Sequence, residues 1–347
     1  MKLESVKVVL PSRKLNNEDI VTLIQQHSEA TYSGDLNKVL QDIRFSLKYS
    51  GAKERYWLDK GETPISLLSQ AVNEALEEAE CKKQDIDLLI YTGISRGFLE
   101  PGGAYFVANA LGMDRVQCFD VLDACMSWTR ALSLSYTLLK TGIYRRIMIV
   151  NAEFNLCGRK GVYPDLFSLN QYEQITWSFP GYTLGEAATA TIVSADPERE
   201  WEFHFSSRTD LAHLCTAPLD GYEGYCHPCE YTARNGADRF TSFGFELHDR
   251  GAPELVSVFE QLKVPLKEIR AIFPHASSKL EWEKGGEYFG IPHLLYYIYP
   301  YCGNVVSASV PTGIALAFKQ GQIQRGDRLV GWVGSAGMSF CAYSFTF

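Results

Sequence analysis

Three residues of the 347-residue chain have the types and settings of a thiol-dependent active site, and Cys125 is the first of them. It follows an apolar run that is typical of a buried strand, and it opens a stretch with helical spacing. We therefore expect it at or next to a helix N-terminus, where the helix dipole and free N–H groups lower a thiol pKa and favour the nucleophilic thiolate. Most cysteines are small packing residues, so this position alone leaves both roles open.

His275 and Asn304 are the other two candidates, and each stands at a predicted strand-to-helix junction. A neutral imidazole and a side-chain amide can both donate hydrogen bonds to one oxygen atom. Together they could hold a thioester carbonyl while the neighbouring carbon becomes an enolate. A structural histidine and a Gly-Asn turn also explain these residues, so the pair alone does not decide the function.

The elements that must position these residues alternate between strands and helices. Short apolar runs predict strands, and apolar residues at helical spacing predict helices, the first of them capped by Thr63. The predicted strands are residues 6–10, 86–94, 116–121, 146–150, 187–193, 270–274, 328–333 and 341–347, with a further short apolar run at 293–299, and the predicted helices are residues 63–79, 125–140 and 307–320. This alternation favours an α/β fold with a largely parallel sheet.

A polar, proline-containing stretch at residues 194–201 separates two halves of this pattern. We therefore divide the chain into an N-terminal half, residues 1–197, and a C-terminal half, residues 198–347. The irregular stretch at residues 211–239 is rich in Gly, Tyr, Cys and His. We interpret it as a long loop near a binding site.

Composition and charge limit the possible functions. Hydrophobic residues make up 46% and charged residues 21% of the chain, as in globular proteins. The 33 Lys and Arg against 41 Asp and Glu give a net charge of −8, so we expect no general attraction to nucleic acid. No run approaches the ~18–20 apolar residues of a membrane helix, and the charged start has no signal-peptide pattern. We therefore expect a cytoplasmic protein whose nine cysteines are free thiols.

His213, Cys215, Cys226 and Cys229 are four possible zinc ligands, because Cys-x-x-Cys with a second nearby pair is a pattern of structural zinc sites. The His-x-Cys half is atypical of such sites, so zinc is the minor alternative and we expect no metal. Two basic pairs, residues 145–146 and 159–160, could contact the phosphates of CoA or phosphopantetheine, although solvated surface charge also explains them.

The motifs around the three candidates together resemble the thiolase superfamily, and most of all its β-ketoacyl-ACP synthase III branch. They are FDVLDAC at residues 119–125, PH at 274–275 and GNVVSASVP at 303–311, in the family's order of Cys, His and Asn. TLGEAA at 183–188 is similar to the family's glycine-rich strand, and residues 326–337 are similar to its C-terminal glycine loop. The resemblance implies a thiolase-like fold of two related α/β halves in an α-β-α-β-α arrangement, with the active site between them.

The resemblance also implies roles for four residues in a two-stage reaction. Cys125 would attack an acyl thioester, and the backbone N–H groups of Cys125 and Ala336 would hold the oxyanion. A second thioester would then become an enolate stabilised by His275 and Asn304, and would attack the acyl-Cys125 carbonyl in a Claisen condensation. The implied partners are acyl-CoA or acyl carrier protein, and no cofactor is required.

A narrower likeness concerns residues 95–101, SRGFLEP, which are similar to a stretch of the bacterial enzymes that join two acyl-CoAs head to head. In those relatives the glutamate enters the partner subunit's active site as a base. Glu100 would take that role here, and the chain would then be a homodimer. An ordinary carboxylate ahead of Pro101 at a helix start also explains Glu100.

Departures from the family pattern at residues 185–187, 276–278 and 335–337 point to a specialised lipid or natural-product pathway. Two other functions stay open. One is an acyltransferase that passes the acyl group from Cys125 to an oxygen or nitrogen nucleophile, against which Asn304 argues because such a transfer needs no enolate stabiliser. The other is a non-catalytic acyl-binding partner subunit, against which the intact Cys125, His275 and Asn304 argue.

Overall fold

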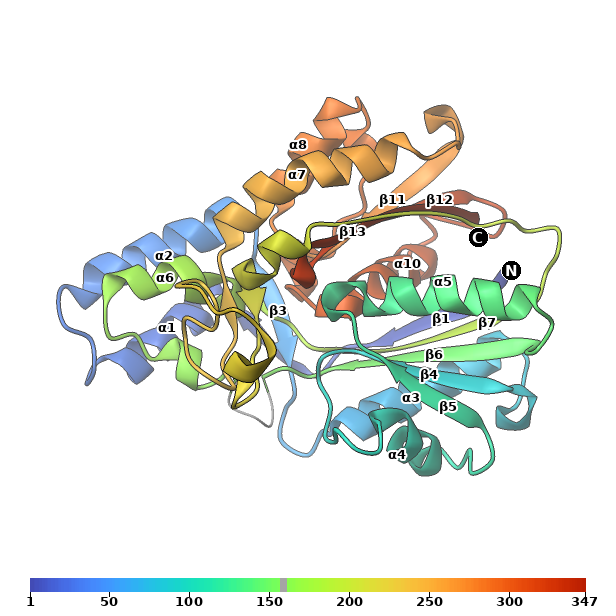
Figure 1. Cartoon of the computed structure of the whole chain (residues 1–347), viewed down its shortest axis with the longest axis horizontal. Coiled ribbons are helices and arrows are strands. Elements are labelled where there is room, and N and C mark those ends of the chain that lie inside the picture. The colour runs from blue at the N-terminus through green and yellow to red at the C-terminus, as the bar shows by residue number, and fades with distance from the viewer. Residues whose placement is uncertain (157–160) are drawn as a thin grey trace.

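In the computed structural model, which describes residues 1–156 and 161–347, two sheets enclose a central pair of helices (Figure 1). The central helices are α5 (Ser127–Lys140) and α10 (Ser309–Lys319). Helices α3 (Pro64–Glu78) and α4 (Gly103–Ala110) cover the outer face of one sheet, and α7 (Gly244–Glu260) and α8 (Lys279–Tyr288) cover the other. This is the α-β-α-β-α arrangement that the resemblance implied.

The first sheet lies in the N-terminal half and is mixed. In spatial order its strands are β1 (Lys2–Val9), β7 (Ala187–Ser194), β6 (Arg146–Glu153), β4 (Leu88–Thr92) and the edge strand β5 (Gln117–Val121). Strands β6, β4 and β5 run parallel, whereas β1 with β7 and β7 with β6 pair antiparallel. The prediction of a largely parallel sheet is wrong, because β7 returns beside β6 in the opposite direction and β1 pairs with its other edge.

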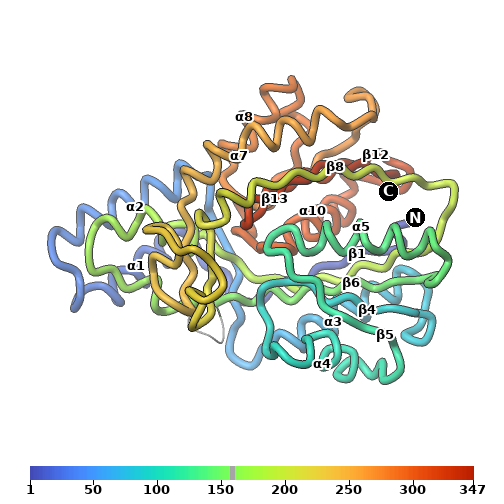
Figure 2. The backbone as a smooth tube through the Cα atoms, in the orientation of Figure 1, coloured from blue at the N-terminus to red at the C-terminus, as the bar shows by residue number. Residues whose placement is uncertain are grey.

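The second sheet lies in the C-terminal half and is mostly antiparallel. Its order is β11 (Ile269–Pro274), β12 (Arg328–Ser335), β13 (Ser339–Thr346) and β8 (Glu202–Ser207), and only β11 and β12 run parallel. Figure 2 shows β8 running beside β13. The apolar run at residues 293–299 forms no strand but only an isolated bridge between Leu295 and Ile272.

A lobe that the sequence analysis missed lies at one end of these layers, at the left in Figures 1 and 2. It is built around α1 (Asn17–Ser28), α2 (Leu36–Ser50), α6 (Ile175–Ser178) and the ribbon of β2 (Arg13–Asn16) with β3 (Glu54–Trp57). Helix α9 (Tyr299–Cys302) packs against β3. Residues 211–239 hold only short 3₁₀ turns and β9 (Cys215–Thr216), which pairs with β10 (Thr241–Ser242).

One buried core between the sheets joins the two halves. Leu3 and Ile90 from the first sheet belong to the same cluster as Phe273 and Phe345 from the second, together with Leu132 of α5. The strands of the two sheets fall within residues 2–194 and 202–346, on either side of the boundary predicted at residues 197 and 198, which stays a prediction. Within the described residues, no helix combines the length and apolar character needed to cross a membrane.

Candidate active site

Cys125 lies in a 3₁₀ turn, Ala124–Met126, between the end of β5 and the first residue of α5. Ala124 has a φ of 44°, in the left-handed region that non-glycine residues rarely adopt. The N–H of Met126 donates to the carbonyl of Asp123 at 2.8 Å and to Ser335 Oγ at 3.1 Å. The hydroxyl of Ser335 in turn donates to the same carbonyl, so a loop of the C-terminal half fixes the turn that carries the thiol.

The electrostatic setting of Cys125 differs from the expected one. The backbone N–H groups of Ala336 and of Cys125 itself hydrogen-bond the thiol and lower its pKa. Burial raises the pKa more than these groups lower it, and the nearby Cys215 and Glu153 raise it further, so that it lies well above its ordinary value. The prediction of a lowered pKa is therefore wrong for the chain without substrate, and the thiol keeps its proton at neutral pH.

His275 follows β11 directly and is almost fully buried. Its backbone N–H donates to the carbonyl of Trp332 at 3.0 Å, which fixes the residue against β12. Burial, and after it the nearby His248, lowers the pKa of His275 to about 4. The imidazole is therefore neutral at physiological pH and can accept a proton.

Asn304 is oriented by its own turn. Its side-chain oxygen Oδ1 accepts the N–H of Val306 at 2.9 Å, which leaves the amide NH₂ to donate elsewhere. Val306 has a φ of 51°, unusual for a β-branched residue, and its backbone also hydrogen-bonds His275 and raises that residue's pKa. One strained residue therefore orients both of the predicted hydrogen-bond donors.

Two glycines explain how the turn of Asn304 meets the N-terminal half. The N–H of Asn304 donates to the carbonyl of Thr183 at 2.9 Å, and its carbonyl accepts the N–H of Gly185 at 3.0 Å. A Cβ on Gly185 would lie 1.9 Å from the carbonyl oxygen of Cys302, and one on Gly303 would lie 2.5 Å from that of Thr183. Only glycine lets these two backbones approach so closely.

The three candidates belong to loops that pack against one another where the halves meet. The turn just after Asn304 contacts the turn that carries Cys125, and that turn also contacts the one that begins at Ala336. Ser309 Oγ, at the start of α10, lies 3.2 Å from His275 Nδ1. The structure therefore brings the predicted nucleophile, both predicted donors and both predicted oxyanion N–H groups to one region between the sheets.

The sequence and the fold of this chain are similar to those of known proteins. Residues 259–347 match the family model for the C terminal of 3-oxoacyl-[acyl-carrier-protein (ACP)] synthase III. The β-ketoacyl-[acyl-carrier-protein] synthase III of Aliarcobacter butzleri is 24% identical over 99% of this chain and 96% of its own length, and that of Campylobacter curvus is 26% identical over 94% and 91%. The crystal structure of the Aquifex aeolicus 3-oxoacyl-[acyl-carrier-protein] synthase III covers 100% of this chain and 99% of its own, with a TM-score of 0.77 and 19% identity.

The chain is similar in sequence to β-ketoacyl-ACP synthases III along most of its length, and it has their fold. A crystal structure of a variant of Xanthomonas campestris OleA has the same fold, with a TM-score of 0.82, 20% identity, and coverage of 99% of this chain and 97% of that one. At such identities the structural matches establish the fold. The roles of the site residues in this synthase III-like chain rest on their chemistry and geometry.

Glu100 belongs to none of these turns. It lies on the exposed segment between β4 and α4. In the part of the chain that the structure describes, its carboxylate makes no hydrogen bond or ion pair. Exposed apolar side chains lie on the same segment, on α4 and on β5, and the ring of Phe98 stacks on that of Phe106 with a centroid distance of 3.8 Å. The segment is anchored next to Glu100 by Arg96, which pairs with Asp120 at 3.2 Å.

The predicted zinc ligands do not form a site. No group of three His, Cys, Asp or Glu residues among the described positions could hold a metal ion. Cys226 and Cys229 are exposed, whereas Cys215 is near Cys125 instead. Of the two predicted phosphate-binding pairs, residues 159–160 lie outside the described residues, and Arg146 is paired with Glu4 at 2.7 Å.

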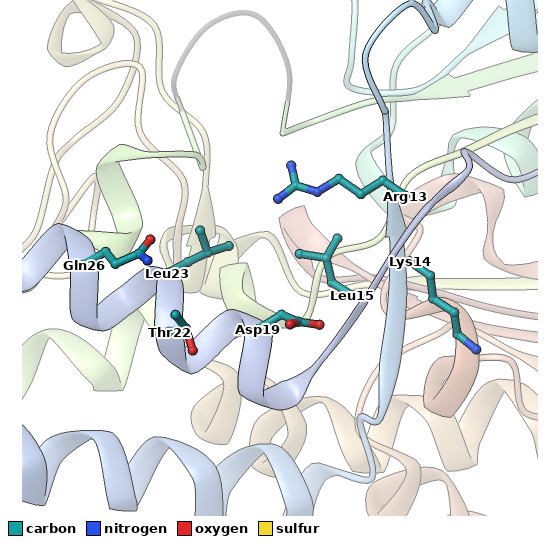
Figure 3. Close-up of a pocket in the computed structure, with 7 residues that line it drawn as sticks. All are labelled: Arg13, Lys14, Leu15, Asp19, Thr22, Leu23 and Gln26. Atoms are coloured by element: carbon teal, nitrogen blue, oxygen red, sulfur yellow. The ribbon is translucent and has the colours of Figure 1, made fainter.

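A separate open cleft of about 290 Å³ lies between the ribbon strand β2 and helix α1 (Figure 3). It is lined by Arg13, Lys14, Leu15, Asp19, Thr22, Leu23 and Gln26. None of these residues is a candidate site residue, so this cleft is distinct from the site around Cys125.

Sequence reasoning gave no role in this site to four residues around it: Cys215, considered only as a zinc ligand, Ser307, quoted only within the motif at residues 303–311, and His248 and Glu153. Glu153 gave a usable signal, because a carboxylate at the end of an apolar run of strand type marks a charged group at the edge of a buried sheet. His248 and Cys215 gave none, since each approaches the site only through contacts between distant parts of the chain. Ser307 stands three positions after Asn304, so its place in the chain was a usable signal.

Proposed function

We propose that this chain catalyses the Claisen condensation of two acyl thioesters through an acyl-Cys125 intermediate. The observation that carries the proposal is the convergence of two backbone N–H groups on the Cys125 thiol, beside turns that present a neutral His275 and an amide donor on Asn304. Backbone donors aimed at a nucleophile stabilise the oxyanion of acyl transfer, and a second pair of donors stabilises an enolate.

In the first stage the thiol proton of Cys125 passes to His275, and the sulfur attacks the thioester carbonyl. The bond between the acyl carbon and the carrier sulfur breaks, and the carrier thiolate recovers the proton from His275. The products are acyl-Cys125 and a free carrier thiol. Since the pKa of Cys125 is raised and that of His275 is lowered, this proton transfer is uphill, and the bound thioester and the N–H groups must stabilise the anion that forms.

The second stage has two possible routes to the enolate. With a malonyl thioester, the bond between the α-carbon and the carboxylate carbon breaks and CO₂ leaves. The electron pair of that bond stays on the α-carbon and forms the enolate, which His275 and Asn304 hold. From an unsubstituted acyl thioester, Glu100 of a second copy of the chain removes the α-proton. In either route the carbanion attacks the acyl-Cys125 carbonyl, and the cysteine sulfur leaves as a thiolate that takes up a proton from water. In the second route Glu100 then releases the α-proton to water, so that the protons balance.

A homodimer that covers the edge strand β5 is part of the proposal. An unpaired strand edge flanked by exposed apolar side chains favours pairing with another chain. Here Leu99 is 66% exposed, Leu122 59% and Phe98 46%, all near that edge. A second copy of the chain bound to this face would bury these side chains. The neighbouring Glu100 of the first copy would then lie toward the active site of the second copy.

The names of relatives support acyl thioesters as the substrate class. Synthases acting on acyl carrier protein are among the relatives by name, and a variant of Xanthomonas campestris OleA was crystallised with bound lauric acid and lauroyl-CoA. We therefore propose acyl-CoA or acyl carrier protein as the carrier, and a specialised lipid or natural-product pathway. No cofactor enters the proposed reaction.

Intact-protein mass spectrometry with a panel of acyl thioesters tests the first stage. We expect a mass increase equal to the acyl group on the wild-type chain and none on Cys125→Ala. Adding malonyl or unsubstituted thioesters to the acylated protein then separates the outcomes. A β-keto product supports condensation, an ester or amide product would instead mean acyl transfer, and no labelling by any donor would leave only a binding role.

Subunit mixing tests the proposed role of Glu100. Cys125→Ala and Glu100→Gln chains are each expected to lack condensation of unsubstituted thioesters. In a mixture, a heterodimer has one site with both groups intact, so activity should return to about a quarter of the wild-type level. No recovery in a mixture shown to contain heterodimers would mean that Glu100 does not act across the dimer.

A further inference from the structure

Glu153 is a carboxylate without exposed surface at the end of β6, beside the candidate site. Its Oε1 accepts hydrogen bonds from the hydroxyl and the backbone N–H of Ser307. Its Oε2 accepts the N–H groups of Ile94 and Ser95, at 3.2 and 3.5 Å, and Asn155 Nδ2 at 3.2 Å. Five donors therefore surround one buried carboxylate, and although burial raises its pKa overall, their hydrogen bonds favour the charged form and offset part of that rise.

The Oε1 side leads to the enolate-stabilising turn. Ser307 is the third residue after Asn304 and lies directly after Val306, whose peptide orients Asn304 and His275. Ser307 Oγ also accepts a hydrogen bond from Asn151 Nδ2 at 2.9 Å, which ties the turn to β6 by a second contact. The position of the turn is thus set from the N-terminal half.

The Oε2 side leads to the segment that carries Glu100. Ile94 and Ser95 follow β4 and begin the exposed stretch that ends at Glu100 and Pro101. Gly93 precedes them with a φ of 126°, and a Cβ there would lie 3.1 Å from the Glu153 carboxyl. The carboxylate therefore fixes the point at which this segment leaves the sheet.

We propose that Glu153 is a positioning residue that holds both groups required for forming the enolate: the Asn304 turn of its own site and the Glu100 segment that serves a second copy. This rests on the proposed function for the roles of Asn304 and Glu100. A buried carboxylate suits this task because it can accept several N–H and O–H donors from separate loops at once. The negative charge has a second effect, since it raises the pKa of the Cys125 thiol.

Single substitutions on the two sides of Glu153 test the proposal. Ser307→Ala removes a donor on the Asn304 side, and Asn155→Ala removes one on the Glu100 side. Ser135→Ala is the matched control, because Ser135 is a buried serine of α5 whose hydroxyl has no partner among the described residues. Three rates are measured: acylation of Cys125, condensation with a malonyl thioester, and condensation with an unsubstituted thioester.

We expect Ser307→Ala to lower kcat of both condensations about 10- to 100-fold, with little change in KM or in Cys125 acylation, because misplaced donors act only on the enolate. Asn155→Ala should lower only the condensation of unsubstituted thioesters. The proposal is overturned if Ser307→Ala matches Ser135→Ala in both condensations. It is also overturned if Asn155→Ala slows the condensation with a malonyl thioester as much as the condensation with an unsubstituted thioester.

A Glu153→Gln variant adds a readout that does not depend on the proposed function. Removing the charge should move the pH profile of Cys125 alkylation by iodoacetamide to lower pH, whereas a merely structural residue would leave it in place. An unchanged profile in a folded variant contradicts the proposal. If the wild-type chain forms no acyl-Cys125 with any donor, the proposed function fails, and the alkylation profile still decides the placement of Glu153. If Glu153→Gln does not fold, the proposal is tested by Ser307→Ala and Asn155→Ala alone.

Discussion

The neutral state of buried His275 should make the chain sensitive to mild acid. The pKa of this imidazole is about 4 in the folded chain against 6.5 for an unperturbed histidine. Between these values an unfolded chain binds a proton at this residue while the folded chain does not. Stability therefore falls as pH drops from about 6.5 toward 4, and is independent of this group above pH 7.

The size of the effect follows from the two pKa values. At pH 5 the unfolded imidazole is almost fully protonated and the folded one is about 10% protonated, which costs the folded state about 2 kcal/mol relative to pH 7. The full difference, reached below pH 4, is about 3 kcal/mol. These values are large against the 5–15 kcal/mol that typically holds a folded domain together.

Urea unfolding at pH 7 and pH 5, compared between the wild-type chain and His275→Asn, measures this contribution. The substitution itself lowers stability at both pH values, because it leaves a buried site imperfectly filled, but the loss between pH 7 and pH 5 should be about 2 kcal/mol smaller in the variant. The other titrating groups, His248 included, are present in both proteins and cancel to first order. An equal loss in both proteins would refute the assignment of a neutral His275.

The other predictions concern the thiols, the packing of the site and the dimer. Peptide-resolved alkylation by iodoacetamide should modify exposed Cys229, whose pKa is lowered by Thr232, at lower pH than Cys125, whose pKa is raised. Equal pH profiles for the two thiols would contradict the raised pKa of Cys125. Gly185→Ala would place a Cβ 1.9 Å from a carbonyl oxygen of the facing turn, so we expect the rate of condensation to fall by at least about 10-fold. Gly224→Ala is the control, because a Cβ at Gly224 would have no atom within 4 Å, and its condensation rate should equal that of the wild-type chain. Phe119→Lys on the edge strand should yield monomers in light scattering and abolish only the condensation of unsubstituted thioesters, and a stable dimer would exclude this edge as the interface.

Local signals in the sequence predicted much of the fold. The helix at residues 63–79 is confirmed as α3, and Thr63 caps it through a hydrogen bond from the N–H of Ser66. The apolar runs at residues 86–94 and 146–150 are confirmed as β4 and β6. Such elements are readable because strand runs and helix caps depend on neighbours along the chain.

Elements and pairings that depend on distant residues were not predictable in this way. Helix α7 was missed because its sequence contains Gly251 and Pro253 and few apolar residues at helical spacing. The prediction of a largely parallel sheet was wrong because the sequence of a strand does not show its direction. The direction of β7 beside β6 is set by the path of the chain between them. The direction of the Cys125 pKa shift was wrong because helix position is visible in sequence, whereas burial by other loops is not.

The site and the junction of the two halves depend on the same contacts. Ser335 of the C-terminal half holds the turn of Cys125, the backbone of Gly185 holds the turn of Asn304, and Glu153 holds Ser307. Each of these hydrogen bonds crosses from one half to the other, and each ends on a residue within three positions of a candidate catalytic group. A small displacement of one half against the other would therefore separate the thiol from the enolate donors before it exposed the shared core. Substitutions at this junction should for that reason reduce condensation more than they reduce the free energy of unfolding, which is the reverse of what substitutions inside either sheet should do.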